Sequence, residues 1–266
     1  MMKIVVLASG SNGNSTYVET SSNKILIDDG ISFKMLLTRA KEMNIDISNI
    51  DSVFLTHEHI DHISGLRMLA KNVKPICYLT QGTFDGMNKE TKDVIVNIKH
   101  QFVKHGDVIY LGCAKITILQ THHDGKEPVG FVIEEGTKKL VYITDTGYVD
   151  QAYYPLISNA NMYVMESNYD VELLWSSNRP FELKKRIDGD HGHMSNEASA
   201  VLLSNIIGAN TKEVVLAHIS DDCNYYDQPN LIIKSHQKVY KDYGLATDNI
   251  HFICGNRKGV TGAFEI

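Results

Sequence analysis

Residues 56–62 read Thr56-His57-Glu58-His59-Ile60-Asp61-His62 and directly follow the apolar run at residues 53–55. The apolar run predicts a buried strand, and because side chains alternate on extended backbone, His57 and His59 point the same way. A turn after Ile60 would bring Asp61 and His62 to the same pocket from another side. Imidazole and carboxylate together suit zinc, manganese or iron, and a catalytic ion keeps one coordination position open. Four local ligands exceed what one such ion takes from one segment, so the stretch predicts two ions in one pocket.

The plain alternative is a solvated, histidine-rich loop, because short metal-like patterns also occur by chance. The spacing, however, resembles the HxHxDH signature of the metallo-β-lactamase superfamily. In that family the first two histidines bind one ion and the Asp-His pair binds the second. The resemblance therefore implies the same division between His57-His59 and Asp61-His62.

Composition describes an ordinary globular protein. The chain has 266 residues, 43% of them hydrophobic, and a formal net charge of −6. No linker rich in proline, glycine and serine divides it, so we expect one domain over residues 1–266. No stretch approaches transmembrane length or reads as a signal peptide, and the four cysteines form no CxxC pair, which favours a reduced, cytoplasmic protein without membrane contact.

Short apolar runs with turn signals between them predict strands, and longer amphipathic runs predict helices. The predicted strands are Lys3–Ala8, Ser15–Glu19, Lys24–Ile27, Ser52–Leu55, Lys115–Leu119, Gly130–Glu134, Lys139–Ile143, Met162–Met165, Glu213–Ala217 and His251–Cys254. The predicted helices are Phe33–Met43, Ile63–Ala70, Ser195–Ile207 and Leu231–Tyr243. This order indicates an α/β or α+β protein, and the family resemblance implies a four-layer αββα sandwich.

Three further strand-like runs end in a possible ligand. Residues 119–123 deliver His122 and His123, and the residues alone leave open which of them reaches a metal. Asp145 ends the run at residues 140–144, where a lone aspartate would normally be a turn residue or helix cap. His218 ends the run at residues 214–217.

The resemblance implies a complete ligand set for two divalent ions, which would be Zn²⁺, Mn²⁺ or Fe²⁺. It puts one ion on His57, His59, His123 and Asp145, and the other on Asp61, His62, Asp145 and His218. His123 matches the family's third histidine because Asp124 and the stretch Pro128–Phe131 follow it, and His122 would then be a supporting group. Asp145 would bridge both ions.

Other polar residues are expected to support this site. His193, before the helix that Ser195 or Asn196 would cap, resembles a phosphodiesterase histidine that contacts the scissile phosphate or protonates the leaving oxygen. We count it with Asp61 as catalytic. Candidates for orienting the ligands or touching substrate are Asp28, Asp29, Ser11, Asn12, Asn14, His122, Glu166 and Asn168.

The motifs together resemble the WalJ/YycJ branch of the superfamily, whose members are bacterial 5′-to-3′ DNA exonucleases. The segments that carry this resemblance are Ser9–Ser15, Thr56–Leu66, Pro128–Phe131, Thr144–Gly147, Glu166–Asn168, Gly192–Asn196 and Leu216–Asn224. It implies a nucleic acid substrate, DNA first, and phosphodiester hydrolysis in which a hydroxide bridging the metals attacks. The alternatives are a hydrolase of small cyclic phosphodiesters or thioesters, which the acidic charge favours, and a metal-stabilised regulatory protein without catalysis. The sequence leaves the oligomeric state open.

Overall fold

Two seven-stranded mixed sheets form the centre of the protein in a computed structural model that describes all 266 residues. The first sheet has the order β14-β1-β2-β3-β4-β5-β6 and the second β13-β12-β11-β10-β9-β8-β7. The strands of the first are β1 (Lys3–Ala8), β2 (Ser15–Glu19), β3 (Lys24–Ile27), β4 (Ser52–Phe54), β5 (Ile76–Thr80), β6 (His100–Val103) and β14 (Gly262–Glu265). Those of the second are β7 (Val108–Leu111), β8 (Ala114–Gln120), β9 (Val129–Glu135), β10 (Lys138–Ile143), β11 (Met162–Glu166), β12 (Glu213–Ala217) and β13 (His251–Cys254).

The sheets pack face to face through alternating inward side chains. Twenty-two buried residues from both sheets form one cluster between them. Phe54 of β4 stacks on Tyr78 of β5 at 4.4 Å between ring centroids, and its edge meets Phe131 of β9 in the opposite sheet at 5.6 Å. Because every strand of this core buries one face here, the register that carries the site residues is fixed by the core.

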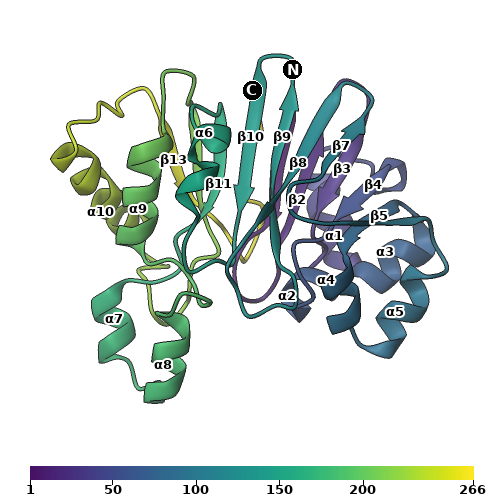
Figure 1. Ribbon diagram of the computed structural model, residues 1–266, viewed down its shortest axis with the longest axis horizontal. Helices are drawn as coiled ribbons and strands as arrows, with labels where there is room; N and C mark the ends of the chain where they lie inside the picture. The colour runs from purple at the N-terminus through teal and green to yellow at the C-terminus, as the bar shows by residue number, and fades with distance from the viewer.

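Helices cover the outer faces, which confirms the four-layer order (Figure 1). Two further buried clusters lie there, one between the first sheet and its helices and one between the second sheet and its helices. The helices on the first side are α1 (Phe33–Glu42), α2 (Ile60–Ile63), α3 (Leu66–Asn72), α4 (Gln81–Gly86) and α5 (Lys89–Ile95), with the 3₁₀ turn η1 (Ile47–Asn49). The later helices are α6 (Tyr154–Ile157), α7 (Val171–Ser176), α8 (Phe181–Ile187), α9 (Asn196–Ile206) and α10 (Pro229–Asp242), with η2 (Gln151–Tyr153).

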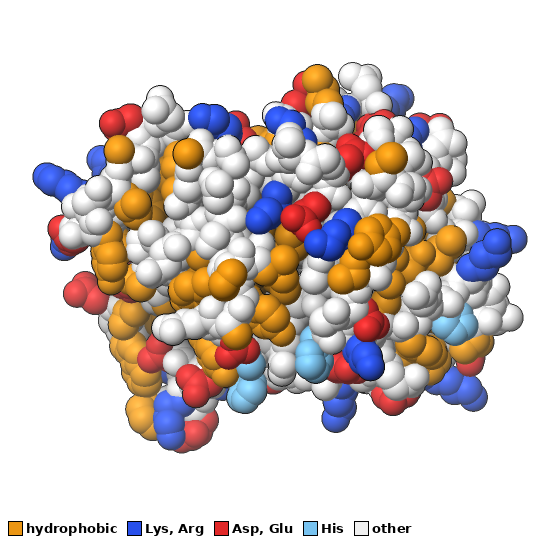
Figure 2. Space-filling view, turned by 45° about the horizontal axis from the view of Figure 1, so that its top comes forward, with side chains coloured by type: hydrophobic (Ala, Val, Ile, Leu, Met, Phe, Trp, Pro, Cys, Tyr) orange, Lys and Arg blue, Asp and Glu red, His pale blue; other side chains and the backbone are white.

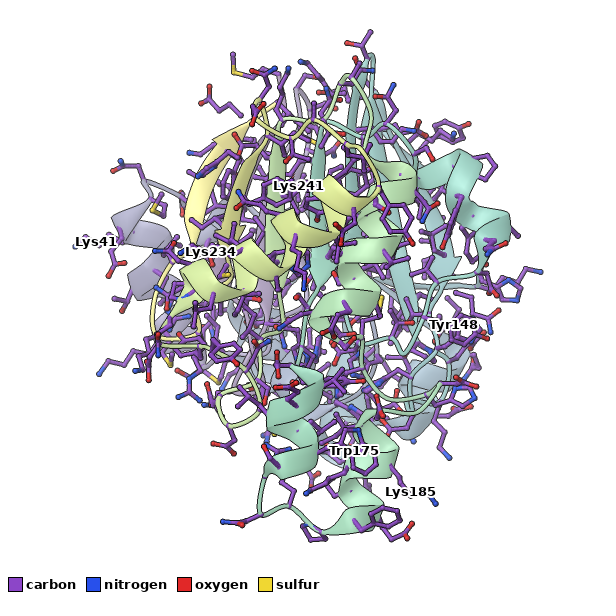
Figure 3. All side chains as sticks on the ribbon, turned by 90° about the vertical axis from the view of Figure 1, so that its left-hand side faces the viewer. Lys41, Tyr148, Trp175, Lys185, Lys234 and Lys241 are labelled. Atoms are coloured by element: carbon purple, nitrogen blue, oxygen red, sulfur yellow. The ribbon has the colours of Figure 1, made fainter.

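Every predicted strand is present, as are three of the four predicted helices, but the sequence missed several short elements. The predicted helix at residues 63–70 is two helices, α2 and α3, separated by Ser64 and Gly65. The edge strands β6, β7 and β14 were missed, as were β5 and the pair α7–α8. That pair forms a hairpin that projects from the body, with Trp175 and Lys185 on it (Figure 3).

The parallel strands deliver their polar ends to one edge of the sandwich. β3 and β4 are parallel in the first sheet, and β10, β11, β12 and β13 are parallel in the second. The chain ends pair at the opposite edge, where Met2 and Ile266 exchange backbone hydrogen bonds (Figure 1). A site outside the carboxyl ends of the strands is the usual arrangement in α/β proteins.

The surface carries both signs of charge. On the face seen in Figure 2, acidic and basic side chains are interspersed and no broad basic patch appears. None of the helices is both long and apolar enough to cross a bilayer.

His236 is a buried histidine outside the group of site residues, in α10 over the second sheet. Its side chain is fully buried, Nδ1 donates to the carbonyl of Ile232 at 3.0 Å, and Nε2 has no hydrogen-bond partner. Burial lowers the pKa of His236 from its ordinary 6.5 to about 4. The imidazole is therefore neutral in the folded protein at physiological pH.

This histidine predicts acid sensitivity. Above pH 6.5 it is neutral in both states and its contribution to stability is complete. Between pH 6.5 and pH 4 the unfolded chain binds the proton first, so the free energy of unfolding should fall by about 2 kcal/mol from pH 7 to pH 5 on this account alone. Urea unfolding at the two pH values should show a smaller loss for His236→Gln than for wild type. The exposed His100→Gln should match wild type, and equal losses in all three proteins would refute the assignment.

Candidate metal centre

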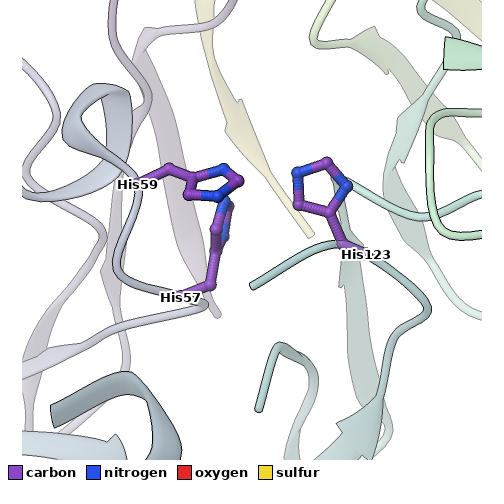
Figure 4. A group of neighbouring side chains, drawn as sticks. All are labelled: His57, His59 and His123. Carbon is purple, nitrogen blue, oxygen red and sulfur yellow. The ribbon is translucent and has the colours of Figure 1, made fainter. Parts of the chain in front are cut away.

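Three histidine rings converge at the edge of the sandwich (Figure 4). His57 and His59 follow β4, and His123 follows β8. Their centroids form a triangle of 4.5, 5.1 and 5.0 Å, and their ring nitrogens lie within 4.8 Å of one another. His57 and His59 come together as predicted, but not through strand alternation, because β4 ends at Phe54 and the segment bends at Thr56 and Glu58.

A second group adjoins the first. Asp61 and His62 lie in α2, and His218 follows β12; their ligand atoms also lie within 4.8 Å of one another. Asp61 Oδ2 is 3.5 Å from His62 Nε2 and 3.4 Å from His218 Nε2.

Asp145 lies between the two groups. Its Oδ2 is 3.1 Å from His62 Nε2, and its Oδ1 is 3.8 Å from His123 Nε2 and 3.4 Å from His218 Nδ1. One carboxylate thus faces both groups. The structure brings together all seven residues that the sequence singled out as ligands.

A buried aspartate organises the segment that carries the first histidines. Asp28 accepts hydrogen bonds from the backbone N–H and hydroxyl of Thr56 at 2.8 and 2.9 Å, and its Oδ2 is 2.7 Å from His62 Nδ1. This contact leaves His62 Nε2 facing the site. The sequence could not choose between Asp28 and Asp29, and the contacts fall to Asp28: both oxygens of buried Asp29 lack a hydrogen-bond partner.

Three of these residues adopt left-handed backbone at the end of a strand. Asp28, Asp145 and His218 have φ values of 57°, 53° and 53°. Such a conformation costs a non-glycine residue about 1–2 kcal/mol. Strained residues of this kind cluster at functional sites, because the turn aims the side chain where a relaxed strand would not.

Glu166, at the end of β11, joins two histidines. Its Oε1 lies 2.7 Å from His193 Nδ1 and 3.2 Å from His218 Nδ1, and its Oε2 accepts the backbone N–H of Thr146 at 2.8 Å. His193 therefore has its Nε2 free. The His193 side chain is 18% exposed, so a substrate can reach it.

The other expected supporting residues divide into two sets. Asn14 Nδ2 is 3.0 Å from His62 Nε2, and Asn168 Nδ2 donates to the His218 carbonyl at 2.7 Å. Ser11 and Asn12 are exposed and make no hydrogen bond to the site. His122 turns away, because its Nε2 contacts Asp150 at 2.8 Å and its ring stacks on Tyr148.

Sequence reasoning missed three residues that touch the site. Ser9 Oγ accepts the backbone N–H of His218 at 2.9 Å. Asp124 Oδ1 lies 3.5 Å from His59 Nε2 and 3.3 Å from His123 Nε2, and Arg186 pairs with the other oxygen of Asp124. Ser9 and Asp124 lie inside segments that the sequence highlighted, whereas nothing local marks Arg186.

Burial and neighbouring charges shift the histidine pKa values of the two groups in opposite directions. Burial, reinforced by the neighbouring charge of His62, holds the pKa of His57 well below its ordinary range. Burial also lowers the pKa of His123. For His62 and His218 burial acts in the same direction, but Asp145 and other carboxylates outweigh it, raising the pKa of His62 well above its ordinary range and that of His218 to about 10.

These residues suit divalent cations. His57 Nε2 is buried without a hydrogen-bond partner, and an orphaned buried nitrogen beside two other imidazoles is the arrangement a metal ion satisfies. On the other side, protons on His62 and His218 balance the carboxylates of Asp61 and Asp145, a role that a cation can take. The donors are imidazole nitrogen and carboxylate oxygen, which fits zinc, manganese or iron.

Comparison with known proteins gives concordant matches. A family model described as the β-lactamase superfamily domain matches residues 23–219. Exodeoxyribonuclease YycJ of Bacillus anthracis is 37% identical over 219 residues, 82% of this chain and 83% of the relative. Exodeoxyribonuclease WalJ of Streptococcus pneumoniae serotype 2 is 35% identical over 248 residues, 92% of this chain and 91% of the relative. The solved structure of Zn²⁺-bound PqqB from Methylobacterium extorquens aligns over 100% of both chains with a TM-score of 0.71 at 15% identity, a likeness of fold.

Asp28 and Asp29 are both buried, but only Asp28 makes hydrogen bonds, so their substitution should have different effects. Asp28→Asn should cost about 3 kcal/mol of stability, because it breaks a fully buried charge pair with His62, and should weaken metal binding about 10- to 100-fold. Asp29→Asn should change both by much less, since burial raises the pKa of Asp29 to about 8 and its carboxyl is neutral at pH 7. Urea unfolding and metal titration of both variants test this, and equal effects would contradict the orienting role of Asp28.

Proposed function

This chain belongs to the β-lactamase superfamily, and on that premise we propose that it is a divalent-metal-dependent 5′-to-3′ exodeoxyribonuclease. The observation that carries the proposal is the convergence of seven imidazole and carboxylate side chains from both sheets. The two exodeoxyribonuclease relatives, which match over most of their own length, supply the substrate class. Because both sheets contribute to the site, we take residues 1–266 as one hydrolase domain.

We assign one ion to His57, His59, His123 and Asp145, and the other to Asp61, His62, Asp145 and His218. Bound ions would lower the pKa of a water molecule, fix phosphate oxygens and neutralise charge as the ester bond breaks. Zinc and manganese are the first metals to test, since both accept this donor set.

The protein's own groups supply positioning and a proton. Burial alone would raise the pKa of Glu166, but His193 and His218 outweigh that effect and lower it. The Glu166 carboxyl is therefore ionised. Its carboxylate accepts the Nδ1–H of His193, which orients the ring so that Nε2 points away from Glu166. In the imidazolium form both ring nitrogens carry a proton, and we assign to the Nε2–H of that form the delivery of a proton to the departing sugar oxygen, which leaves His193 neutral with its remaining proton on Nδ1.

The substrate and the polarity of cleavage can be tested with end-labelled DNA. With zinc or manganese bound, the protein should release mononucleotides from the 5′ end of duplex DNA, so that a 5′ label is lost early and a 3′ label late. The His59→Ala/Asp61→Ala variant, which lacks a ligand to each ion, should bind less metal and be inactive. Intact DNA under both metals, with turnover of a small phosphodiester or thioester, would instead favour a small-molecule hydrolase. Absence of any metal-dependent turnover would favour a regulatory protein.

The role of His193 in proton delivery can be tested by substitution. His193→Ala should lower kcat on DNA about 10²- to 10⁴-fold with both ions retained, because it removes the proton donor and no expected metal ligand. His191→Ala, two residues earlier and exposed, is the matched control and should stay near wild type. Metal content and kcat of both variants are the measurements. A full rate in His193→Ala would remove this residue from the mechanism.

A further inference from the structure

The α7–α8 hairpin is fastened to the candidate catalytic histidine. The backbone N–H of His193 donates to the carbonyl of Ile187, the last residue of α8, at 2.9 Å. Gly192 makes this crossing possible, because a Cβ there would lie 2.2 Å from the carbonyl oxygens of Arg186 and Ile187. The hydroxyl of Tyr169 and the indole N–H of Trp175 both donate to Asp188, which follows α8. The backbone at Arg186 therefore has a fixed position relative to His193.

The Arg186 side chain reaches back to the site. Its Nε donates to Asp124 Oδ2 at 2.6 Å, and its Nη2 contacts the same oxygen. The other oxygen, Asp124 Oδ1, is the one that faces His59 and His123. A single carboxylate thus lies between a guanidinium and two imidazoles, at the rim of the centre.

The guanidinium is accessible from solvent, and one of its nitrogens is unoccupied. Its Nη1 has no protein partner, and the side chain is 56% exposed. Arg186, His123 and His193 also line one small cavity, so the guanidinium borders the groups to which we assign metal binding and proton delivery. Guanidinium recognises phosphate through paired N–H donors, the same donors that Asp124 now occupies.

We propose that Arg186 is a substrate-phosphate-binding residue, held ready by Asp124, and that a phosphodiester entering the site replaces Asp124 as the partner of the guanidinium. This rests on the proposed function for the identity of the substrate. It assigns the hairpin a role in substrate positioning. It also supplies a local positive group on a protein whose net charge is −6.

The alternative is an ordinary surface ion pair that fastens the hairpin. Such pairs contribute little to stability and would leave DNA binding unchanged. The adjacent Lys185 provides a matched control, because its ammonium carries the same charge on the same helix but lies over the Phe181 ring, 5.5 Å from the centroid. A general loss of charge would affect both positions alike.

The test measures equilibrium binding of metal-loaded protein to two probes. One is a DNA duplex whose phosphorothioate linkages resist cleavage, and the other is inorganic phosphate. Arg186→Ala should weaken DNA binding about 10-fold and reduce the slope of log K against log salt by about 0.9, the loss of one phosphate contact. Arg186→Lys should restore most of the slope but less of the affinity, because a point charge replaces a fork. Lys185→Ala should stay within about 2-fold of wild type.

Asp124→Asn should change the binding affinity in the opposite direction to Arg186→Ala. Removing the competing carboxylate should tighten binding of both probes, and more so with Arg186 present than in an Arg186→Ala background, where only the general loss of negative charge acts. The proposal is overturned if Arg186→Ala behaves like Lys185→Ala, or if wild type binds neither probe. If wild type binds phosphate but not DNA, the exonuclease assignment fails. The role of Arg186 in binding phosphate can still be tested in that case, because Arg186→Ala should weaken phosphate binding more than Lys185→Ala does.

Discussion

The buried charge cluster around Asp28 is the constraint on which the site depends. Its carboxylate is removed from water, and three hydrogen-bonding contacts to Thr56 and His62 compensate for that burial. These contacts tie the end of β3 to the loop after β4. Gly30 continues the tie, because a Cβ at that position would lie 1.6 Å from the carbonyl oxygen of Asp61. The ligand segment is thus fitted against the β3 turn before any ligand binds.

The second sheet also positions site residues at the ends of its strands. Asp145 and His218 leave their strands through left-handed turns, and Glu166 ends the strand between those two. The turns carry strain, but the sheet below them is closed on both faces by apolar packing, so the strand ends cannot relax without disturbing that packing. Rigid strand ends place ligands more accurately than mobile loops do.

The site residues that the sequence predicted are marked by local sequence patterns. Most of what it left open or missed depends on contacts between residues far apart in the chain. His57, His59, Asp61 and His62 share one short segment between the end of β4 and α2, so their nearness in sequence suffices to group them. The edge strand β6 was missed because His100 and Gln101 leave it without an apolar run, whereas the edge strand β7 is an apolar run of four residues that the sequence analysis passed over. The choice of Asp28 over Asp29 depended on which side chain meets His62, 34 residues away. Arg186 pairs with Asp124, 62 positions away, and lies in α8, a seven-residue helix whose periodicity is too brief to read.

The charges of the centre also constrain the order in which it assembles. Asp61, Asp145 and Glu166 lie close together, and the nearby protonated histidines are what balance them without metal. A phosphodiester approaching that state meets carboxylates in a protein of net charge −6. Divalent cations reverse the local field, since each brings two positive charges to a place where histidine brings one. On the proposed function we infer that metal binds before substrate, because the cations and the Arg186 guanidinium would then offset the carboxylates that an entering phosphodiester meets.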